Sequence, residues 1–360
     1  MPVDIGSLKL YMGPKALGAP DDLEEAIVSF IGGARKDLFI AVQELESRPI
    51  AEAILRAKQR EIRVRLILEG KYLTVEKALD DPWSPGGENE ANREIHTALL
   101  RVKVDVISDL NPDTFHQKFI VRDPDGPRAA VLTGSTNFTP TGVGHNLNHV
   151  VVIKGKRVAA LYKEEFEESW SGTFGQKSER HGPAPKTYQV SGVRVKVLFA
   201  PDHAPELEIM KQMLKASQRV DFAMFTFAQS SGIDDTMIFL SRAGIPVRGV
   251  LDRRQGNQKW AATRPIIDAG AELWWPRTGS GVRKVHHKLM VIDQQVVIAG
   301  SFNYTAPANA MNDENIIVIG SVFEQDTDAR ANQRRFAGYA LQELDRIIQD
   351  QAERIPFPSP

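Results

Sequence analysis

The chain has 360 residues, enough for one large domain or for two medium domains that each bury a core. Its formal net charge of -1 provides no overall attraction to nucleic acid or to an anionic membrane, so any such contact must be local. The absence of cysteine excludes disulfides and thiolate metal sites. Residues 1–18 lack a basic segment followed by an apolar one, and no stretch approaches a membrane span, so a soluble, cytoplasmic protein is expected.

The predicted elements come twice in the same order. The first set alternates strands with helical stretches at 8–14, 23–33, 37–42, 50–59 and 62–69. The second set does the same at 193–201, 206–217, 219–227, 234–243 and 245–252. Each set continues with a variable loop and four further strands, at 102–108, 115–123, 131–139 and 149–153 in the first half and at 271–276, 285–293, 297–305 and 315–319 in the second. Such a repeat predicts two structurally equivalent units.

Strands rich in Val and Ile that alternate with helical segments predict an α/β fold with mixed, largely buried sheets. Residues 171–192 are rich in Gly, Pro and Ser and are typical of a linker. We therefore predict a first lobe at 1–175, a linker at 176–189 and a second lobe at 190–360. Each lobe is a mixed β-sheet flanked by helices, and packing about an approximate two-fold axis would bring matching motifs to one shared site between the lobes.

The repeat carries a polar motif inside otherwise apolar strands, "FHQKFIVRD" at 115–123 and "VHHKLMVID" at 285–293. The motif residues have the same spacing in both halves: His116, Lys118 and Asp123, and His286, Lys288 and Asp293. Residues two apart on a strand face the same way, so each His and Lys form a pair on one face. The Asp residues have the opposite parity, and we interpret them as supporting residues that tie down strand ends.

The next strand of each half adds a serine and an asparagine, Ser135 with Asn137 and Ser301 with Asn303. A converging set of His, Lys, Ser and Asn is rich in hydrogen-bond donors and contains a possible nucleophile. Such a set suits an anionic tetrahedral group such as a phosphodiester. The other histidines, including His287, are interpreted as surface or packed residues.

With these motifs, "HQKFIVRD" with "GSTNFT" and "HHKLMVID" with "GSFNYT", the chain resembles the two-motif members of the phospholipase D superfamily. The likeness runs over nearly the whole chain and is closest in character to the nuclease-like bacterial phosphodiesterases. It implies cleavage or transfer at phosphodiesters through a covalent phosphohistidine, with no metal or other cofactor and with a complete site in one monomer. It does not fix the substrate, because one fold hosts many substrates.

The resemblance also implies roles for individual residues. His116 would attack phosphorus and His286 would protonate the leaving oxygen, while Lys118, Lys288, Asn137 and Asn303 hold the non-bridging oxygens. Family members have a residue about a dozen positions after Gly-Ser that orients a histidine, and here Glu314 and Asn148 occupy these positions. Spacing alone predicts that Glu314 orients His286 and that Asn148 orients His116. A carboxylate raises the pKa of a neighbouring imidazole, which on this pairing favours His286 as the proton donor.

Local charge is the remaining guide to substrate. Residues 253–288 contain eight basic and two acidic residues, whereas the corresponding 71–118 contains six basic and nine acidic ones. Arg253, Arg254, Lys259 and Trp260 follow a predicted strand, and cations interleaved with an aromatic suit a groove that binds single-stranded nucleic acid. The loop at 80–92 offers one Trp among acids, a poor match to an anionic membrane.

The sequence therefore favours a nuclease acting on single-stranded DNA or RNA. The alternative is a phospholipase D or phosphatidyltransferase acting on glycerophospholipids. An inactive binding protein is disfavoured because both motifs are intact.

Overall fold

The computed structural model describes residues 1–178 and 184–356, which form two nine-stranded sheets. The first sheet has the order β1 (Val3–Asp4), β2 (Leu8–Gly13), β8 (Asn146–Lys154), β7 (Ala130–Gly134), β6 (Lys118–Arg122), β3 (Asp37–Val42), β4 (Arg63–Leu68) and β5 (Asp105–Ser108), with β14 (Lys284–Val285) added beside β8. The second has the order β18 (Ala352–Arg354), β13 (Glu272–Pro276), β12 (Val247–Leu251), β11 (Val220–Met224), β15 (Lys288–Ile292), β16 (Val296–Gly300), β17 (Glu314–Ile319), β10 (Val193–Ala200) and β9 (Thr187–Val190).

The two sheets confirm the predicted repeat. The order β2-β8-β7-β6-β3-β4-β5 in the first matches β10-β17-β16-β15-β11-β12-β13 in the second. In each sheet the last three of these strands are parallel and the others pair antiparallel, which is the mixed pattern expected. Every residue of β3 and of β17 is buried. Strands covered on both faces require apolar residues at both parities, which explains their continuous apolar runs.

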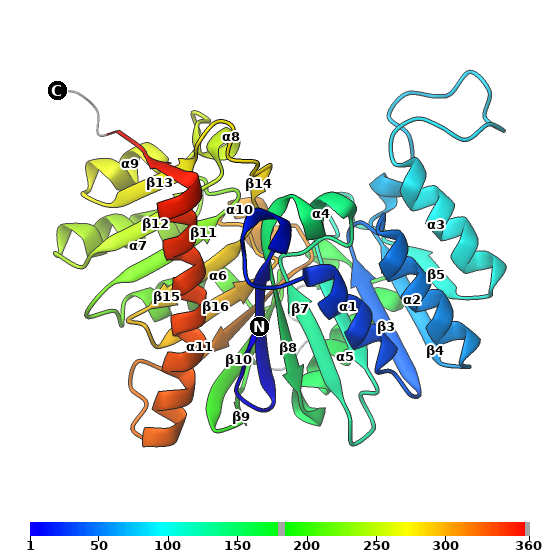
Figure 1. Ribbon diagram of the computed structural model, residues 1–360, viewed down its shortest axis with the longest axis horizontal. Helices are drawn as coiled ribbons and strands as arrows, with labels where there is room; N and C mark the ends of the chain where they lie inside the picture. The colour runs from blue at the N-terminus through cyan, green and yellow to red at the C-terminus, as the bar shows by residue number, and fades with distance from the viewer. Residues whose placement is uncertain (179–183, 357–360) are drawn as a thin grey trace.

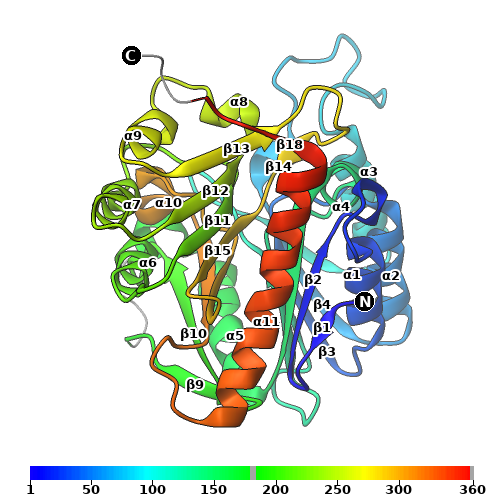
Figure 2. The ribbon, with the colours of Figure 1, turned by 60° about the vertical axis from the view of Figure 1, so that its left-hand side comes forward.

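Helices cover the outer face of each sheet and also fill the space between the sheets (Figures 1 and 2). The outer helices are α1 (Leu23–Gly32), α2 (Arg48–Gln59) and α3 (Glu90–Arg101) on the first sheet and α6 (Pro205–Met213), α7 (Gly232–Arg242) and α9 (Thr263–Asp268) on the second. Two longer helices, α5 (Lys156–Trp170) and α11 (Thr327–Arg346), belong to a central core shared by both lobes. The short helices are η1 (Lys15–Leu17), η2 (Gly70–Leu73), α4 (Pro140–Gly144), η3 (Gly175–Ser178), α8 (Arg253–Gly256), α10 (Ala306–Ala310) and the π-helix η4 (Ile347–Gln351).

Local sequence signals explain where several helices begin. Asp22 and Asp326 accept hydrogen bonds from the backbone N–H three residues on and so cap α1 and α11. Ser47 caps α2 in the same way and is followed by a proline in the first turn. The central helices α5 and α11 were not among the predicted elements. They follow the last repeated strand in each half, and they join the two lobes into one core.

The lobe boundaries at 1–175 and 190–360 stay a prediction. The predicted linker 176–189 includes residues 179–183, which lie outside the described residues. Its last part is not a free connection, because Thr187–Val190 forms β9 at the edge of the second sheet. In the parts of the chain that the structure describes, no helix combines the length and the hydropathy needed to cross a membrane.

Candidate active site

His116 and His286 lie immediately before β6 and β15, at the junction of the two lobes. Each histidine donates its backbone N–H to a carbonyl of the opposite lobe, His116 to Asp313 O at 3.0 Å and His286 to Leu147 O at 2.9 Å. Short parallel strand contacts extend both connections, Phe115 with Asp313 and β14 with β8. The repeated motif is therefore brought to one shared site, as predicted, by backbone pairing across the lobe boundary.

As a result, the imidazole of each histidine is oriented by a side chain of the opposite lobe. Nδ1 of His116 lies 2.7 Å from Oε2 of Glu314, and Nδ1 of His286 lies 2.9 Å from Oδ1 of Asn148. The predicted pairing, Glu314 with His286 and Asn148 with His116, is wrong. Because the backbone N–H of each histidine is hydrogen-bonded to the opposite lobe, the side chain that orients its imidazole comes from the adjacent strand of that lobe. The prediction that His286 is the donor because it has a carboxylate partner loses its basis.

The hydroxyl groups of Ser135 and Ser301 are hydrogen-bonded to the orienting residues Asn148 and Glu314 and do not face a position that a phosphate could occupy. The Ser135 hydroxyl donates to Asn148 Oδ1 at 2.8 Å, and the Ser301 hydroxyl donates to Glu314 Oε2. Both hydroxyls also accept a backbone N–H from the neighbouring strand. The preceding glycine is required by close packing, because a Cβ on Gly134 would lie 2.3 Å from the His149 carbonyl oxygen. The two serines thus support the orienting residues, whereas the sequence grouped them with the donors that would face the phosphodiester.

Lys118 and Lys288 are buried beside the histidines and keep part of their donor capacity. Lys118 Nζ donates to the His116 carbonyl at 2.7 Å and to Gln43 Oε1 at 2.9 Å. Lys288 Nζ donates to the His286 carbonyl at 3.1 Å and lies 5.1 Å from the centre of the Phe225 ring. An ammonium group has three N–H donors, so each lysine has at least one left for an anionic oxygen.

The two asparagines differ in how freely they could bind a phosphate. Asn303 Oδ1 accepts the backbone N–H of Thr226 at 3.3 Å, and within the described residues its amide NH₂ has no partner. The Asn137 NH₂ donates to the Glu44 carboxylate instead. Glu44 was not predicted, and it stands where the second lobe has Thr226. The structure therefore leaves Asn303 available and engages Asn137 elsewhere.

Asp123 and Asp293 lie at the ends of β6 and β15 and are fully used by the backbone. Asp123 accepts the N–H groups of Arg35, Lys36 and Asp37. Asp293 accepts those of Ser217, Gln218 and Arg219. This confirms their interpretation as residues that tie down strand ends.

Burial and neighbouring cations set the protonation of the site. Burial raises the pKa of Glu314 to about 8, against the opposing pull of Lys118. Burial lowers the pKa of Lys118 to about 7, opposed by Glu314 and Glu44. The pKa of both motif histidines, His116 and His286, is lowered, first by burial and then by the two lysines, and His116 also lowers that of His286. Both imidazoles are therefore neutral at neutral pH unless a substrate phosphate stabilises their charged form.

The residue after each motif histidine forms a second pair across the lobes, which the sequence did not reveal. His287 stacks on His149 with ring centroids 5.5 Å apart, and their Nδ1 atoms lie 3.2 Å apart. Gln117, at the equivalent position in the first lobe, accepts the Asn315 side-chain amide at 2.7 Å. All four side chains are buried. The pairing of both motif strands with their opposite lobe is therefore made by matched side chains as well as by backbone.

The four predicted substrate-binding residues do not act as one group. Arg254 and Trp260 line a pocket with Phe225 and Lys284. Arg253 is engaged by Glu353 and by the Pro276 carbonyl, and Lys259 lines a different cavity on the same lobe. These residues follow β12, as predicted, but they line different cavities: Arg253 and Arg254 share one, Arg254 and Trp260 another, and Lys259 a third.

One group of side chains in the described residues could hold a metal ion, namely Glu165, Glu168 and Asp202, whose oxygens lie within 4.8 Å of one another. It lies on α5 and on the turn after β10. Among residues 1–178 and 184–356, no comparable set of carboxylates surrounds the two motif histidines.

Two histidines with buried lysines at a two-lobed junction define a phosphodiesterase site, and the comparisons agree. The family model described as "Cardiolipin synthase, PLD-like domain" matches residues 27–170 and 209–336. A phospholipase D of Rickettsia bellii is 31% identical over 148 residues, which are 39% of this chain and 70% of that protein. The mitochondrial cardiolipin hydrolase of Xenopus laevis is 29% identical over 110 residues, 31% of this chain and 50% of that protein. The chain belongs to the phospholipase D superfamily.

Solved structures share the fold of the whole chain. Phosphatidylserine synthase of Haemophilus influenzae Rd KW20 matches with a TM-score of 0.66 over 99% of this chain and 88% of that one, at 12% identity. Polyphosphate kinase of Porphyromonas gingivalis matches with a TM-score of 0.60 over 97% of this chain and 48% of that one, at 13% identity. At these identities the likeness concerns the fold alone.

Proposed function

We propose that this protein is a phospholipase D or phosphatidyltransferase that acts on glycerophospholipids through a phosphohistidine. The observation that carries the proposal is the pair of buried imidazoles, each oriented through Nδ1 by the opposite lobe, with two buried lysine side chains beside them. An imidazole held through Nδ1 presents Nε2 to the substrate. Two such nitrogens, with two lysines whose charged form a bound phosphate stabilises, suit a phosphodiester that is attacked on one side and whose leaving group departs on the other.

His116 is the proposed nucleophile. Its Nε2 forms a bond to phosphorus while the bond to the leaving oxygen breaks, and that oxygen takes a proton from His286 Nε2. The phosphorylated imidazole with a proton on Nδ1 is cationic, and the Glu314 carboxylate at 2.7 Å stabilises this charge. His286 faces the neutral amide of Asn148, so its imidazolium gives up a proton more readily. Water or an alcohol then attacks phosphorus, gives a proton to His286 and returns the bonding pair to His116.

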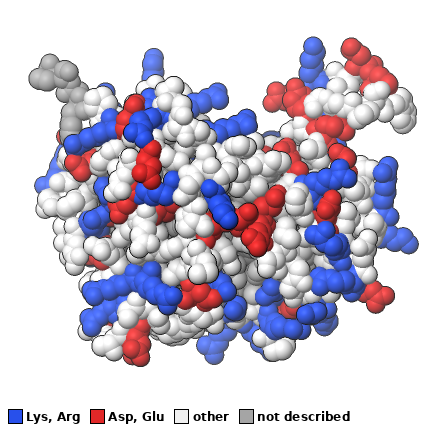
Figure 3. Space-filling view, in the orientation of Figure 1, with Lys and Arg blue, Asp and Glu red and all other residues white. Residues whose placement is uncertain are grey.

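The similarity to proteins named phospholipase D and cardiolipin hydrolase supports a lipid substrate over the nucleic acid favoured by the sequence alone. Exposed apolar side chains support it as well. Trp83 is 94% exposed and Leu110 is 72% exposed in loops of the first lobe, and Trp260 is 44% exposed in the second. Both loop regions lie along the upper edge in Figure 1, although acidic side chains flank the projecting loop in Figure 3. Tryptophan at a membrane surface places its apolar ring among lipid head groups.

To test this, the whole chain is assayed in excess EDTA against two groups of substrates. One group is micellar phosphatidylglycerol, phosphatidylcholine and cardiolipin, and the other is labelled single-stranded DNA and RNA. Release of phosphatidic acid is expected, and His116→Ala or His286→Ala should abolish it. His96→Asn, on the outer helix α3, is the matched control and should keep full activity. Cleavage of the oligonucleotides with all lipids intact would contradict the proposal and restore the nuclease.

A further inference from the structure

A pocket of about 540 Å³ lies beside His286 on the second lobe. It is lined by Phe225, Asp252, Arg254, Gln255, Gln258, Trp260, Arg283 and Lys284. The Phe225 ring separates this pocket from the catalytic site, because its centroid is 4.9 Å from that of the His286 imidazole. The pocket is thus one aromatic ring away from the proposed proton donor.

The pocket has an excess of positive charge. Arg254, Arg283 and Lys284 have no ion-pair partner among residues 1–178 and 184–356, whereas the adjacent Arg253 pairs with Glu353. Lys284 Nζ lies 5.4 Å from the centre of the Phe225 ring. The one carboxylate that lines the pocket, Asp252, is buried and accepts the backbone N–H groups of Gln255 and Val285. Three unpaired cations thus converge where an anion could bind.

The first lobe repeats the same elements but has other residues at the positions that make this pocket cationic and aromatic. The residues three and two before the catalytic histidine are Asp113 and Thr114 in the first lobe, against Arg283 and Lys284 in the second. The residue after the equivalent strand is Gln43 against Phe225. The repeat supplies both lobes with catalytic residues, so the cationic pocket is an addition to one side of the site.

We propose that this pocket binds a negatively charged group, such as a second phosphate, on the leaving part of the substrate. The inference rests on the proposed function and on its assignment of His286 as proton donor. In-line attack by His116 expels the leaving oxygen toward His286, so the pocket beside His286 faces the leaving part. A head group of phosphorylated glycerol has the matching chemistry, and Trp260 offers an apolar wall to its carbon skeleton.

The experiment compares substrates with and without a second phosphate on the leaving side; in the micellar pair this phosphate belongs to a second phosphatidyl group, and in the water-soluble pair it stands alone. Cardiolipin and phosphatidylglycerol are the micellar pair, in neutral detergent. Glycerophosphoglycerol and its terminal phosphate ester are the water-soluble pair, which tests the pocket without any lipid surface. We expect kcat/KM to be at least about tenfold higher for the phosphorylated member of each pair, because charge-assisted hydrogen bonds are among the strongest.

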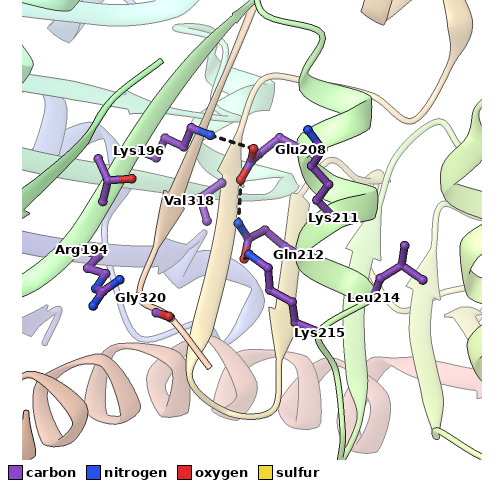
Figure 4. Close-up of a pocket in the computed structure, with 11 residues that line it drawn as sticks. Arg194, Lys196, Glu208, Lys211, Gln212, Leu214, Lys215, Val318 and Gly320 are labelled. Carbon is purple, nitrogen blue, oxygen red and sulfur yellow. Dashed lines mark hydrogen bonds and ion pairs between the residues drawn. The ribbon is translucent and has the colours of Figure 1, made fainter. Parts of the chain in front are cut away.

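The key variant combines Arg283→Asp with Lys284→Thr, which places the first-lobe residues in the second lobe. We expect the preference for the phosphorylated substrate to fall about tenfold or more. The control combines Lys211→Gln with Lys215→Gln in a different basic cavity, of about 610 Å³, shown in Figure 4. That cavity also contains Arg194, six residues along β10 from Ala200 opposite Glu314, a separation of roughly 20 Å. The control variant should keep the wild-type preference.

A wild-type enzyme without preference in the water-soluble pair, or a preference that survives in Arg283→Asp with Lys284→Thr, would overturn the pocket assignment. Failure of the proposed function looks different. In that case no micellar lipid is cleaved, while the water-soluble pair still reports on the pocket. Loss of the preference in both variants would indicate a general effect of surface charge and would also overturn the assignment.

Discussion

Glu314 of the second lobe holds His116 of the first, with its Oε2 2.7 Å from the imidazole Nδ1. The reciprocal contact, Asn148 to His286, is made by a neutral amide. The two lobes repeat the same strands and motifs, yet the site places a carboxylate behind one histidine and an amide behind the other. This difference decides which imidazole can carry a stabilised positive charge once it is bonded to phosphorus.

The first prediction concerns the covalent intermediate. In His286→Ala, a substrate with a 4-nitrophenol leaving group needs no proton from the enzyme, so attack proceeds while hydrolysis lacks its base. A phosphoenzyme should accumulate, and mass spectrometry should place it on His116. An adduct on His286 in the His116→Ala protein, with none on His116, would reverse the two roles.

The second prediction concerns the orienting carboxylate. Glu314→Gln can still accept the Nδ1–H of His116 but cannot stabilise its positive charge. We expect kcat to fall by about 10²-fold with a small change in KM, since the interaction strengthens as the intermediate forms. Glu208, a buried carboxylate on α6 that pairs with Lys196, provides the control: Glu208→Gln should leave kcat unchanged. An equal loss in both variants would attribute the effect to stability.

The repeat, the order of elements along the chain and the two His-Lys pairs could be predicted from the sequence because they depend on local patterns. The crossed pairing could not, because it depends on contacts between residues far apart, such as His286 with Leu147. Spacing along the chain correctly places Glu314 near Ser301, but it cannot show which of the two histidines the Glu314 carboxylate contacts. The engagement of Asn137 by Glu44 was hidden for the same reason. The nuclease hypothesis rested on summed charge, which did not show that Arg253 is already paired.

The third prediction concerns pH. Lys118, with a pKa lowered to about 7 by burial, loses its charge as the pH rises, which weakens phosphate binding. Glu314, with a pKa raised to about 8 by burial, gains the charge that stabilises His116 only as the pH rises. Because the two requirements oppose each other, kcat/KM should pass through a narrow maximum between about pH 7 and 8. The profile of Glu314→Gln should lose its rising limb and that of Lys118→Met its falling limb. A wild-type profile that is flat from pH 6 to 9 would contradict both assignments.

The fourth prediction separates a structural aspartate from the catalytic residues. Asp293 accepts backbone N–H groups from Ser217, Gln218 and Arg219 at 2.8 to 3.0 Å. Asp293→Asn should lower the free energy of unfolding by about 1–3 kcal/mol, because charge-assisted hydrogen bonds are lost. At temperatures below its unfolding transition, the kcat of Asp293→Asn should stay within about twofold of the wild-type value, since Asp293 does not face the site. A loss of kcat in fully folded Asp293→Asn would show that it acts in catalysis.

The last prediction concerns the histidine pair between the lobes. His149 Nε2 accepts the Gly300 backbone N–H, so its proton is on Nδ1 and is donated to His287. Burial lowers the pKa of His149 to about 3, so the pair is neutral and acts by packing and hydrogen bonding. His287→Gln or His149→Asn alone breaks this bond and should lower the free energy of unfolding by about 1–3 kcal/mol. The double variant recreates the amide pair that Asn315 and Gln117 form on the other side. It should be more stable than the sum of the single effects by about 1 kcal/mol or more. Urea unfolding of the four proteins measures this coupling, and strictly additive losses would show that the two histidines do not act as a pair.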